Sequence, residues 1–270
     1  LRFLGSPLRG WTTAAMGSTL EEGVDPALVL AALPRFAFAE LGCIHLECAD
    51  RSLLDATRVP SGFHVTTLPG YELELAIDGE PRSDADLLAA MTPHGRRDVR
   101  RSLRNGIVVE AVDPLDPGDF ASVYYQQVSE AFARRSRLPT YPVERVEALI
   151  RHLGPTGDLL LLRSRTPAGE VAATGIFPGI PGGTAEFWMG ASTRSLQPQL
   201  PNEALMWEAL RRWRDRGASR FNFGGGGTYK AKYGGAPHTM PWARRSRFAG
   251  LEPARAIAFD LYRRRQRAVR

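Results

Sequence analysis

Apolar residues recur every three or four positions in several stretches of the chain, and this spacing predicts amphipathic helices. The clearest stretch is 201–217, which begins with proline, ends at Gly217 and brings Leu205 and Trp213 to one face. Residues 25–42 follow the same pattern, and we expect this helix to break at Pro34. Further helices are predicted at 83–106 on both sides of Pro93, at 119–137, at 143–154 and at 252–270.

Short apolar runs bounded by glycine and proline predict strands between these helices. Three consecutive runs over residues 158–192 indicate an antiparallel meander, because proline- and glycine-containing turns join them. The predicted strands are 43–49, 63–77, 107–113, 158–165, 170–179, 183–192, 220–225 and 240–249. The order of elements predicts an α/β (α+β) fold, a mixed sheet flanked by helices. The stretch 113–119, which contains two prolines, is the predicted seam between two domains.

The chain has 270 residues, of which 43% are hydrophobic and 24% charged, as is typical of a soluble globular protein. No apolar run approaches the ~20 residues that a membrane span requires, and no signal peptide is visible. The first residue is Leu1 rather than methionine. We therefore expect the natural chain to begin upstream or to be processed.

A net charge of +6 favours anionic partners such as nucleic acid, phosphorylated donors or acidic lipid. A codon bias toward arginine explains the same charge equally well. The two cysteines, Cys43 and Cys48, form C-x-H-x-x-C with His45, which lacks a fourth zinc ligand. We therefore predict no metal site, and two core cysteines in a reduced, cytoplasmic protein.

The stretch GGGGTYKAKYGG at 224–235 holds Lys230 and Lys232, which are the only lysines in the chain. It follows a predicted strand, as phosphate-binding loops do. A Walker A motif requires serine or threonine after the lysine, where Ala231 stands, and Tyr229 occupies the third glycine position of G-x-G-x-x-G. The sequence therefore excludes both motifs and predicts a flexible loop that presents the two lysines.

Lysine differs from arginine in ways that bear on catalysis. Its ammonium is compact and can lose its proton, whereas the guanidinium is broad and permanently charged. A group that stabilises an oxyanion can require the narrow cation, so we interpret Lys230 as a catalytic candidate. The alternative is that two lysines occur together by chance on a solvated loop, and for Lys232 the two interpretations are balanced.

The segment from 202 to 235 resembles the C-terminal core of the Fem-type peptidoglycan-bridge aminoacyltransferases and related GNAT-like acyltransferases. These have a helix with a central tryptophan, a short Asp-Phe-Gly-Gly strand and an aromatic-Lys-x-x-aromatic-Gly signature. The matching positions here are Trp207, Gly217, Asn222-Phe223-Gly224-Gly225 and Tyr229 to Gly234. Strand 185–192 and the basic helix ahead of Gly106 also match, so the resemblance spans roughly residues 90–250.

The resemblance implies two tandem GNAT-like halves, an incomplete first half at 1–115 and a second at 116–270 that carries the lysine signature. It implies transfer of an amino acid from aminoacyl-tRNA, or of an acyl group from a thioester, onto an amine. The family lysine corresponds to Lys230. Asn222 stands where the family has aspartate, so a proton acceptor at that place is in doubt.

Other residues complete the candidate site. Strand alternation puts Glu186, a candidate base for the attacking amine, on the same face as Trp188, for which a core position is the preferred interpretation. The catalytic candidates are Lys230, Tyr229 and Glu186. The substrate-binding candidates are Trp188, Asn222, Lys232, Tyr233, Asn202, Arg97, Arg100, Arg101 and Arg104. The four arginines share one helix face that could hold phosphates of tRNA or of a pyrophosphate-bearing acceptor, or could merely be solvated.

Three hypotheses follow. The first is an aminoacyltransferase that moves an amino acid from aminoacyl-tRNA to an amine-bearing acceptor such as a cell-wall precursor, with no cofactor. The second is a GNAT-like N-acyltransferase that uses acyl-CoA on a sugar amine or small metabolite. The stretch 194–205, where such enzymes bind pyrophosphate, has no glycine, which counts against CoA. The third is a non-catalytic RNA- or phosphate-binding module.

Overall fold

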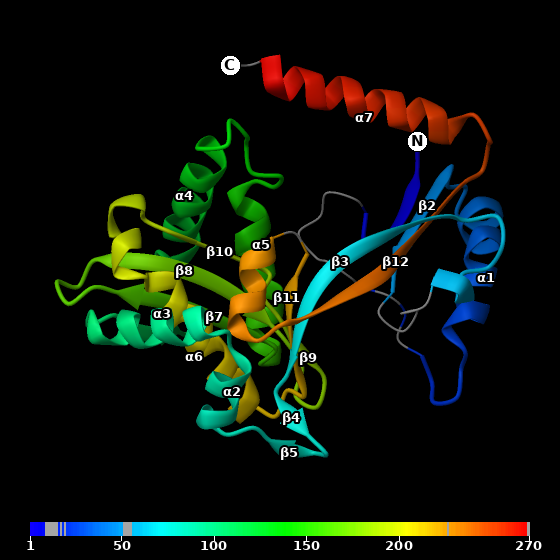
Figure 1. Ribbon diagram of the computed structural model, residues 1–270. Helices are drawn as coiled ribbons and strands as arrows, with labels where there is room; N and C mark the ends of the chain where they lie inside the picture. Colours follow the sequence, from blue (N-terminus) through cyan, green and yellow to red (C-terminus); the bar gives the residue numbers. More distant parts are fainter. Residues whose placement is uncertain (9–15, 17, 19, 51–55, 226, 269–270) are drawn as a thin grey trace. The chain divides into compact units, whose positions relative to one another are not determined.

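A computed structural model describes residues 1–8, 16, 18, 20–50, 56–225 and 227–268 (Figure 1). The chain divides into two compact units: unit 1 comprises Leu1–Pro69 and His238–Arg270, and unit 2 comprises Gly70–Pro237. The predicted boundary between residues 115 and 116 lies inside unit 2, so the compact units do not follow it. The division into two tandem GNAT-like halves stays a prediction.

Unit 1 is built on paired strands with an apolar side and a polar side. Its elements are β1 (Phe3–Ser6), α1 (Pro26–Arg35), η1 (Phe36–Glu40), β2 (His45–Ala49), η2 (Ala56–Arg58), most of β12 (Ala236–Ser246) and α7 (Leu251–Ala268). β1 runs parallel to β2, and β2 runs antiparallel to β12. Leu46 and Cys48 face the apolar side with Leu30 of α1, whereas His45 and Glu47 are buried on the other side. Both cysteines are buried free thiols, which confirms their predicted place in the core.

Unit 2 holds the remaining elements. They are β3 (His64–Glu74), which begins in unit 1, β4 (Ala76–Ile77), β5 (Glu80–Pro81), α2 (Asp84–Ala90), α3 (Pro93–Arg104), β6 (Val108–Val112), α4 (Phe120–Ala133), α5 (Val143–Leu153), η3 (Gly154–Thr156), β7 (Leu159–Arg165), β8 (Val171–Pro178), β9 (Thr184–Glu186), β10 (Met189–Ser192), η4 (Arg194–Gln199), α6 (Pro201–Asp215), β11 (Arg220–Gly224) and η5 (Thr228–Tyr233). The mixed α/β architecture confirms the predicted fold class.

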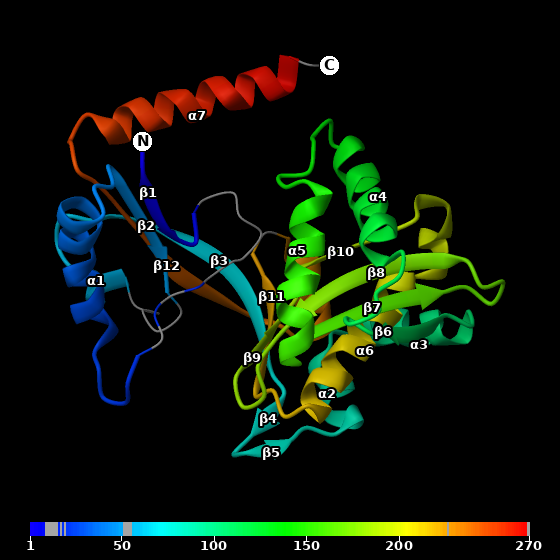
Figure 2. The ribbon, with the colours of Figure 1, turned by 180° about the vertical axis from the view of Figure 1, so that it is seen from behind.

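An antiparallel sheet of order β10-β8-β7-β6 lies between two helical layers (Figures 1 and 2). α4 covers one side, where Phe120 and Tyr124 are fully buried, and α6 covers the other, where Leu205 and Trp213 are buried. β11 pairs antiparallel with β3 and parallel with β9. The predicted meander and the amphipathic helix 201–217 are thus confirmed.

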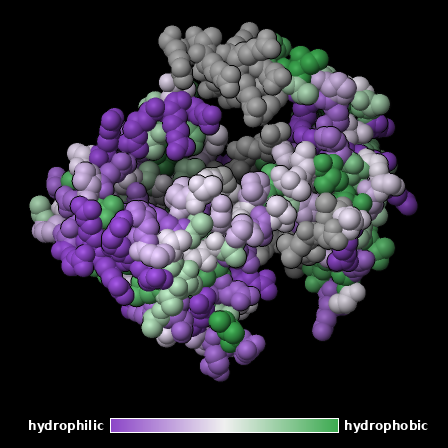
Figure 3. Space-filling model, viewed as in Figure 1, coloured by the Kyte–Doolittle hydropathy of each residue, from purple (hydrophilic) through white to green (hydrophobic). Residues whose placement is uncertain are grey.

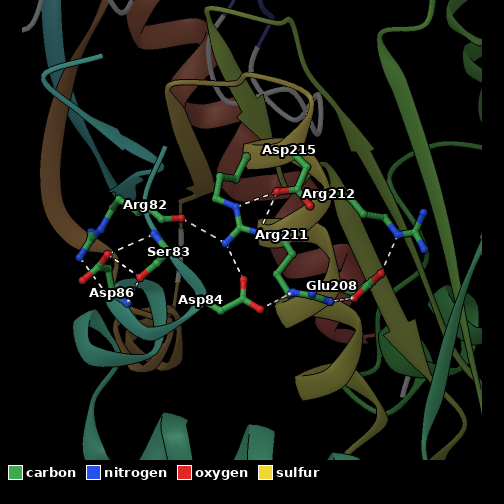
Figure 4. A network of polar contacts seen from close by, with 9 residues as sticks. Arg82, Ser83, Asp84, Asp86, Glu208, Arg211, Arg212 and Asp215 are labelled. Carbon is green, nitrogen blue, oxygen red and sulfur yellow. Dashed lines mark hydrogen bonds and ion pairs between the residues drawn. The ribbon is translucent and has the colours of Figure 1, made fainter. Parts of the chain in front are cut away.

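Ion pairs and hydrogen bonds join the start of α2 to the later turns of α6 (Figure 4). Asp84 accepts hydrogen bonds from Arg214 at 2.5 Å and from Arg211 at 3.0 Å. Ser83 caps α2 in a reciprocal capping box with Asp86. This network fixes one end of α6, and the opposite end of the same helix contributes to the candidate site.

Three sequence predictions differ from the structure. The first helix is not broken at Pro34: it loses one backbone bond there and continues into the π-helical turn η1. The predicted strand 183–192 divides into β9 and β10, which pair with different neighbours. The lysine loop is not wholly flexible, because residues 228–233 form the 3-10 turn η5.

None of the described helices is long and apolar enough to span a membrane.

Candidate active site

The division between β9 and β10 creates a fork in the strands of unit 2. β9 pairs with β11 as far as Glu186, and the Phe187 N–H still donates to the Asn222 carbonyl at 2.8 Å. The next N–H, of Trp188, turns away and donates to Ile176 of β8 at 3.1 Å. From there β10 pairs with β8 alone among the described strands, so β10 and β11 separate.

Lys230 places its amine at this fork. Its Nζ donates to the Gly225 carbonyl oxygen at 2.6 Å and lies 6.0 Å from the centre of the Phe187 ring. A β-carbon at Gly224, the last residue of β11, would lie only 3.6 Å from the same nitrogen. The side chain is 7% exposed. The turn η5 therefore folds the lysine back onto the end of β11, a contact that the sequence order does not reveal.

The electrostatic setting of Lys230 suits a catalytic cation. Burial lowers the pKa of its ammonium from 10.5 to about 8. No described carboxylate forms an ion pair with it, and one carbonyl oxygen is its hydrogen-bond acceptor. Near neutral pH the group is mainly charged, and it retains N–H donors for a substrate oxygen. Such a donor can stabilise an oxyanion as it develops.

Lys232 has a different setting although it lies in the same turn. Its Nζ donates to Glu203 of α6 at 2.6 Å and lies 3.6 Å from Asp98 of α3. Its backbone oxygen accepts the Thr92 N–H at 3.1 Å and leaves no room for a side chain at Gly95. These contacts hold η5 against both helices. The substrate-binding role predicted for Lys232 stays a prediction, and the ion pairs give it a positioning role.

The two tyrosines of the signature also separate. Tyr233 is buried and stacks on Phe223 with ring centres 6.1 Å apart, so it belongs to the core of unit 2. Tyr229 is 53% exposed. Of the two, only Tyr229 presents surface to a ligand, and the substrate-binding role of Tyr233 rests on the sequence alone.

Glu186 and Asn222 lie side by side at the base of the fork. The Asn222 Nδ2 group donates to Glu186 Oε1 at 3.3 Å, and its Oδ1 accepts the Gly224 N–H at 2.7 Å. Aspartate at position 222 would place two carboxylates against each other, which is unfavourable when both are charged. The asparagine amide at this position is therefore compatible with a charged Glu186 beside it.

Trp188 packs in a different core cluster from Ala185 and Phe187, and the face that it is predicted to share with Glu186 stays a prediction. Trp188 packs with Tyr141 and Tyr124 at 5.1 and 6.4 Å between ring centres. Its side chain is buried beneath β10. This confirms the preferred interpretation of Trp188 as a core residue.

The four arginines Arg97, Arg100, Arg101 and Arg104 form an exposed face of α3, here called the arginine face. The opposite side of α3 is buried: Gly95 contacts η5, and Ser102 donates to the Leu200 oxygen at the start of α6. The arginine face is therefore directed away from η5 and α6. Figure 3 shows hydrophilic atoms over this part of unit 2.

The turn between β10 and α6 is tied down by side chains. Asn202 and Gln197 both donate to Ser192 Oγ, at 2.9 and 3.2 Å, and Asn105 of α3 donates to the Gln199 oxygen at 3.0 Å. The turn η4 contains no glycine, and none of its residues is buried. Asn202 thus joins α6 to β10, and its substrate-binding role stays a prediction.

Sequence reasoning missed Phe187, Asp98 and Glu203 as parts of this site. Asp98 and Glu203 are carboxylates on otherwise buried faces of their helices, and that anomaly was the available signal. Phe187 could not be identified from the sequence, because the residues around it do not indicate that the strand breaks there. Among the described residues, no group of three or more His, Cys, Asp or Glu side chains could hold a metal ion.

Comparison with known proteins agrees with this architecture. FemX matches with a TM-score of 0.64 and 13% identity, over 80% of this chain and 75% of that one. The C-terminal domain of a putative lysylphosphatidylglycerol synthetase from Agrobacterium fabrum matches with a TM-score of 0.57 and 14% identity, over 80% of this chain and 73% of that one. L-PGS from Bacillus licheniformis matches with a TM-score of 0.54 and 14% identity, over 83% and 74%. At these identities the likeness shows a shared fold.

The family assignment comes from the sequence itself. No curated protein matches the chain. The family described as acetyltransferase (GNAT) domain matches residues 93–233, which is more than half of the chain and includes α3, the fork and η5. The predicted GNAT-like acyltransferase is thereby confirmed: this chain belongs to the acetyltransferase (GNAT) domain family.

Proposed function

We propose that this chain transfers an aminoacyl group from aminoacyl-tRNA to an amine acceptor, and that Lys230 stabilises the negative charge that develops during transfer. The observation that carries the proposal is the isolated amine at the fork. It is buried, it donates to one carbonyl oxygen, and no described carboxylate pairs with it. A cation kept in this way has its charge available for a substrate oxygen.

In the proposed reaction the amine nitrogen of the acceptor attacks the carbonyl carbon of the donor ester. A C–N bond forms, the C–O bond to the ribose breaks, and Lys230 stabilises the oxyanion or the leaving oxygen. Glu186 accepts the proton of the amine and passes it to that leaving oxygen, and Asn222 orients the carboxylate through its 3.3 Å bond. Tyr229 donates a hydrogen bond to the donor. The ester is already activated, so positioning supplies most of the rate.

Two features support tRNA over CoA as the donor. The turn η4 lacks the glycines of a pyrophosphate cradle. The arginine face is directed away from η5, so a small donor seated at Lys230 would leave it unused. A nucleic acid is long enough to contact both places, and it is rich in phosphates for the arginines.

The acceptor is proposed to be an amine on a cell-wall precursor or a peptide-like metabolite. FemX, L-PGS and a domain of a putative lysylphosphatidylglycerol synthetase share the fold, and the name of the last states an aminoacylated lipid product. The reaction as proposed needs no metal and no bound cofactor. The reaction would take place in the cytoplasm, where aminoacyl-tRNA is made.

An acyl-CoA donor acting on a sugar amine or small metabolite is the second candidate, because the matching family is named for acetyl transfer. Its prediction is stoichiometric, micromolar binding of CoA in a calorimetric titration. The third candidate, an RNA-binding module without turnover, is opposed by the family assignment. It predicts tRNA binding with no transfer of the amino acid.

The deciding experiment offers both donors to the purified chain. One arm uses total tRNA charged with radiolabelled amino acids and the other uses labelled acetyl-CoA, each with the same mixture of amine acceptors. We expect label in the acceptors from the tRNA arm and its loss in Lys230→Met. Transfer from acetyl-CoA alone would establish the second candidate, and unchanged transfer in Lys230→Met would remove Lys230 from the mechanism.

A further inference from the structure

The polar side of the unit 1 strands carries charged side chains that the proposed reaction does not use. In the antiparallel pair of β2 and β12, Arg244 lies directly opposite Glu47, and Ser246 lies opposite His45. Residues opposite each other in this way project to the same side. All of them except Ser246, which is half-buried, lie in the interior. The strands therefore assemble a buried polar group from segments almost 200 residues apart.

Two carboxylates near this group, Glu47 and Glu252, already have polar partners. Glu47 contacts the guanidinium of Arg255 and lies 3.1 Å from His45 Nε2. Ser246 Oγ donates to Glu252 at 3.0 Å and lies 2.8 Å from His45 Nδ1. The series Ser246, His45 and Glu47 has the composition of a hydrolytic triad, but the serine proton is donated to Glu252. Ser246 is therefore not activated by the imidazole.

Arg244 is the exception in this group. Its side chain is 8% exposed, its Nε has no hydrogen-bond partner, and no ion pair joins its guanidinium to a described carboxylate. Among the described residues, the ring of Trp242 contacts it, with a centre that lies 5.1 Å from the guanidinium carbon. A buried cation without a counter-ion destabilises a fold unless something outside the chain compensates it.

We propose that Arg244 anchors an oxyanion-binding site in unit 1, which takes a phosphate or carboxylate group of a ligand. The guanidinium presents paired N–H donors whose spacing fits two oxygens of either group, and Trp242 holds its plane. His45 has hydrogen-bond partners on both ring nitrogens, Ser246 and Glu47. Glu47 contacts Arg255 and Glu252 accepts the Ser246 proton, and neither carboxylate forms an ion pair with Arg244. This site lies outside the proposed catalytic residues and does not depend on their function.

The test measures thermal unfolding of the full chain in a chloride buffer of constant ionic strength. Inorganic phosphate, pyrophosphate and acetate are added in separate arms, so that phosphate and carboxylate ligands are distinguished. We expect a saturable rise in melting temperature of about 5–10 °C at roughly 100 times the dissociation constant. Arg244→Gln should melt at or above the wild-type temperature without anion, because it removes an unpaired buried charge, and should lose the response.

Arg245→Gln is the matched control, since Arg245 is the next residue of the same strand and its guanidinium lies 5.8 Å from the Phe63 ring. It should keep the anion response. Arg244→Lys keeps the charge but not the paired donors, and calorimetric titration of pyrophosphate should show at least tenfold weaker binding to it. An equal response in Arg244→Gln would place the anion elsewhere, for example on the arginine face. No response in the wild type, or a less stable Arg244→Gln, would make Arg244 structural and overturn the proposal.

Discussion

Lys230 and Lys232 lie two residues apart in one 3-10 turn, and their side chains have opposite surroundings. Lys230 is buried at a strand fork with a carbonyl oxygen as its partner, whereas Lys232 is paired with Glu203 and Asp98. The paired lysine stabilises the turn, and the unpaired one is held in place by it. The comparison indicates that a reactive cation can be buried without a counter-ion when a neighbouring residue stabilises the turn that carries it.

Replacing Lys230 with methionine or arginine should cause the largest loss of activity. We expect kcat to fall by about 10²–10³, or roughly 3–4 kcal/mol, because the oxyanion loses its donor. Arginine should not restore it, because the guanidinium is too wide for the same position. Single-turnover transfer from charged tRNA measures the loss. The methionine variant should be at least as stable as the wild type, and a large drop in its melting temperature would contradict this assignment.

Replacing Lys232 with methionine should affect stability first. Glu203 and Asp98 would remain largely buried without a cation, which we expect to lower the free energy of unfolding by about 2–3 kcal/mol. Lys232→Arg should be milder, because either cation can pair with the carboxylates. Denaturant unfolding of Lys232→Met, Glu203→Gln and the double variant gives the coupling between the two. Additive effects would show that the ion pair does not fasten the turn.

The pH dependence tests Lys230 directly. Folding lowers the pKa of its ammonium from 10.5 to about 8, so the charged form is disfavoured in the folded chain. The free-energy cost of burying the ammonium is fully present below pH 8. It declines as the pH rises from about 8 to 10.5 and is absent above pH 10.5. Activity that requires the ammonium should fall about tenfold per pH unit above 8, whereas a nucleophilic amine would give a rise through pH 8.

Mass spectrometry offers a substrate-free version of this test, because the chain contains only two lysines. Labelling of Lys230 by an amine-reactive reagent should increase steeply near pH 8. Lys232, which is held by two carboxylates, is the internal comparison and should label more slowly.

Asn222→Asp should have a smaller effect. It replaces the amide that donates to Glu186 at 3.3 Å with a second carboxylate, so the two acids should share one proton at neutral pH. We expect about 1 kcal/mol lower stability and a shift of the activity optimum to higher pH. Asn222→Ala removes the amide without adding charge. If the two variants have the same pH profile, the carboxylate pair plays no part.

The arginine face should have the smallest effect on catalysis. If it holds tRNA phosphates, each of Arg100→Gln and Arg101→Gln should reduce the slope of log affinity against log salt by about one. The rate of a single turnover at saturating donor should stay unchanged. Binding of tRNA by filter retention across a salt series measures this, and equal slopes would show that the face is merely solvated.

Much of the fold could be predicted from the chain, because its signals are local. Helix 201–217 and the meander over 158–192 follow from apolar spacing and turn residues. The division into β9 and β10 could not be predicted, because Phe187 and Trp188 bond to different neighbouring strands. The choice of partner depends on where β8 and β11 lie, and no local pattern encodes that.

The candidate site divides in the same way. The sequence by itself determined which residues bear the chemistry: two lysines in an arginine-rich chain, a glycine-flanked turn and an arginine face on one helix. Tertiary structure decided what each of them does. Asp98 and Glu203 come from two other helices and form ion pairs with Lys232, while Lys230 is buried at the fork and pairs with no described carboxylate. The effect of a charged side chain depends on its surroundings, and those are set by contacts between segments distant in sequence.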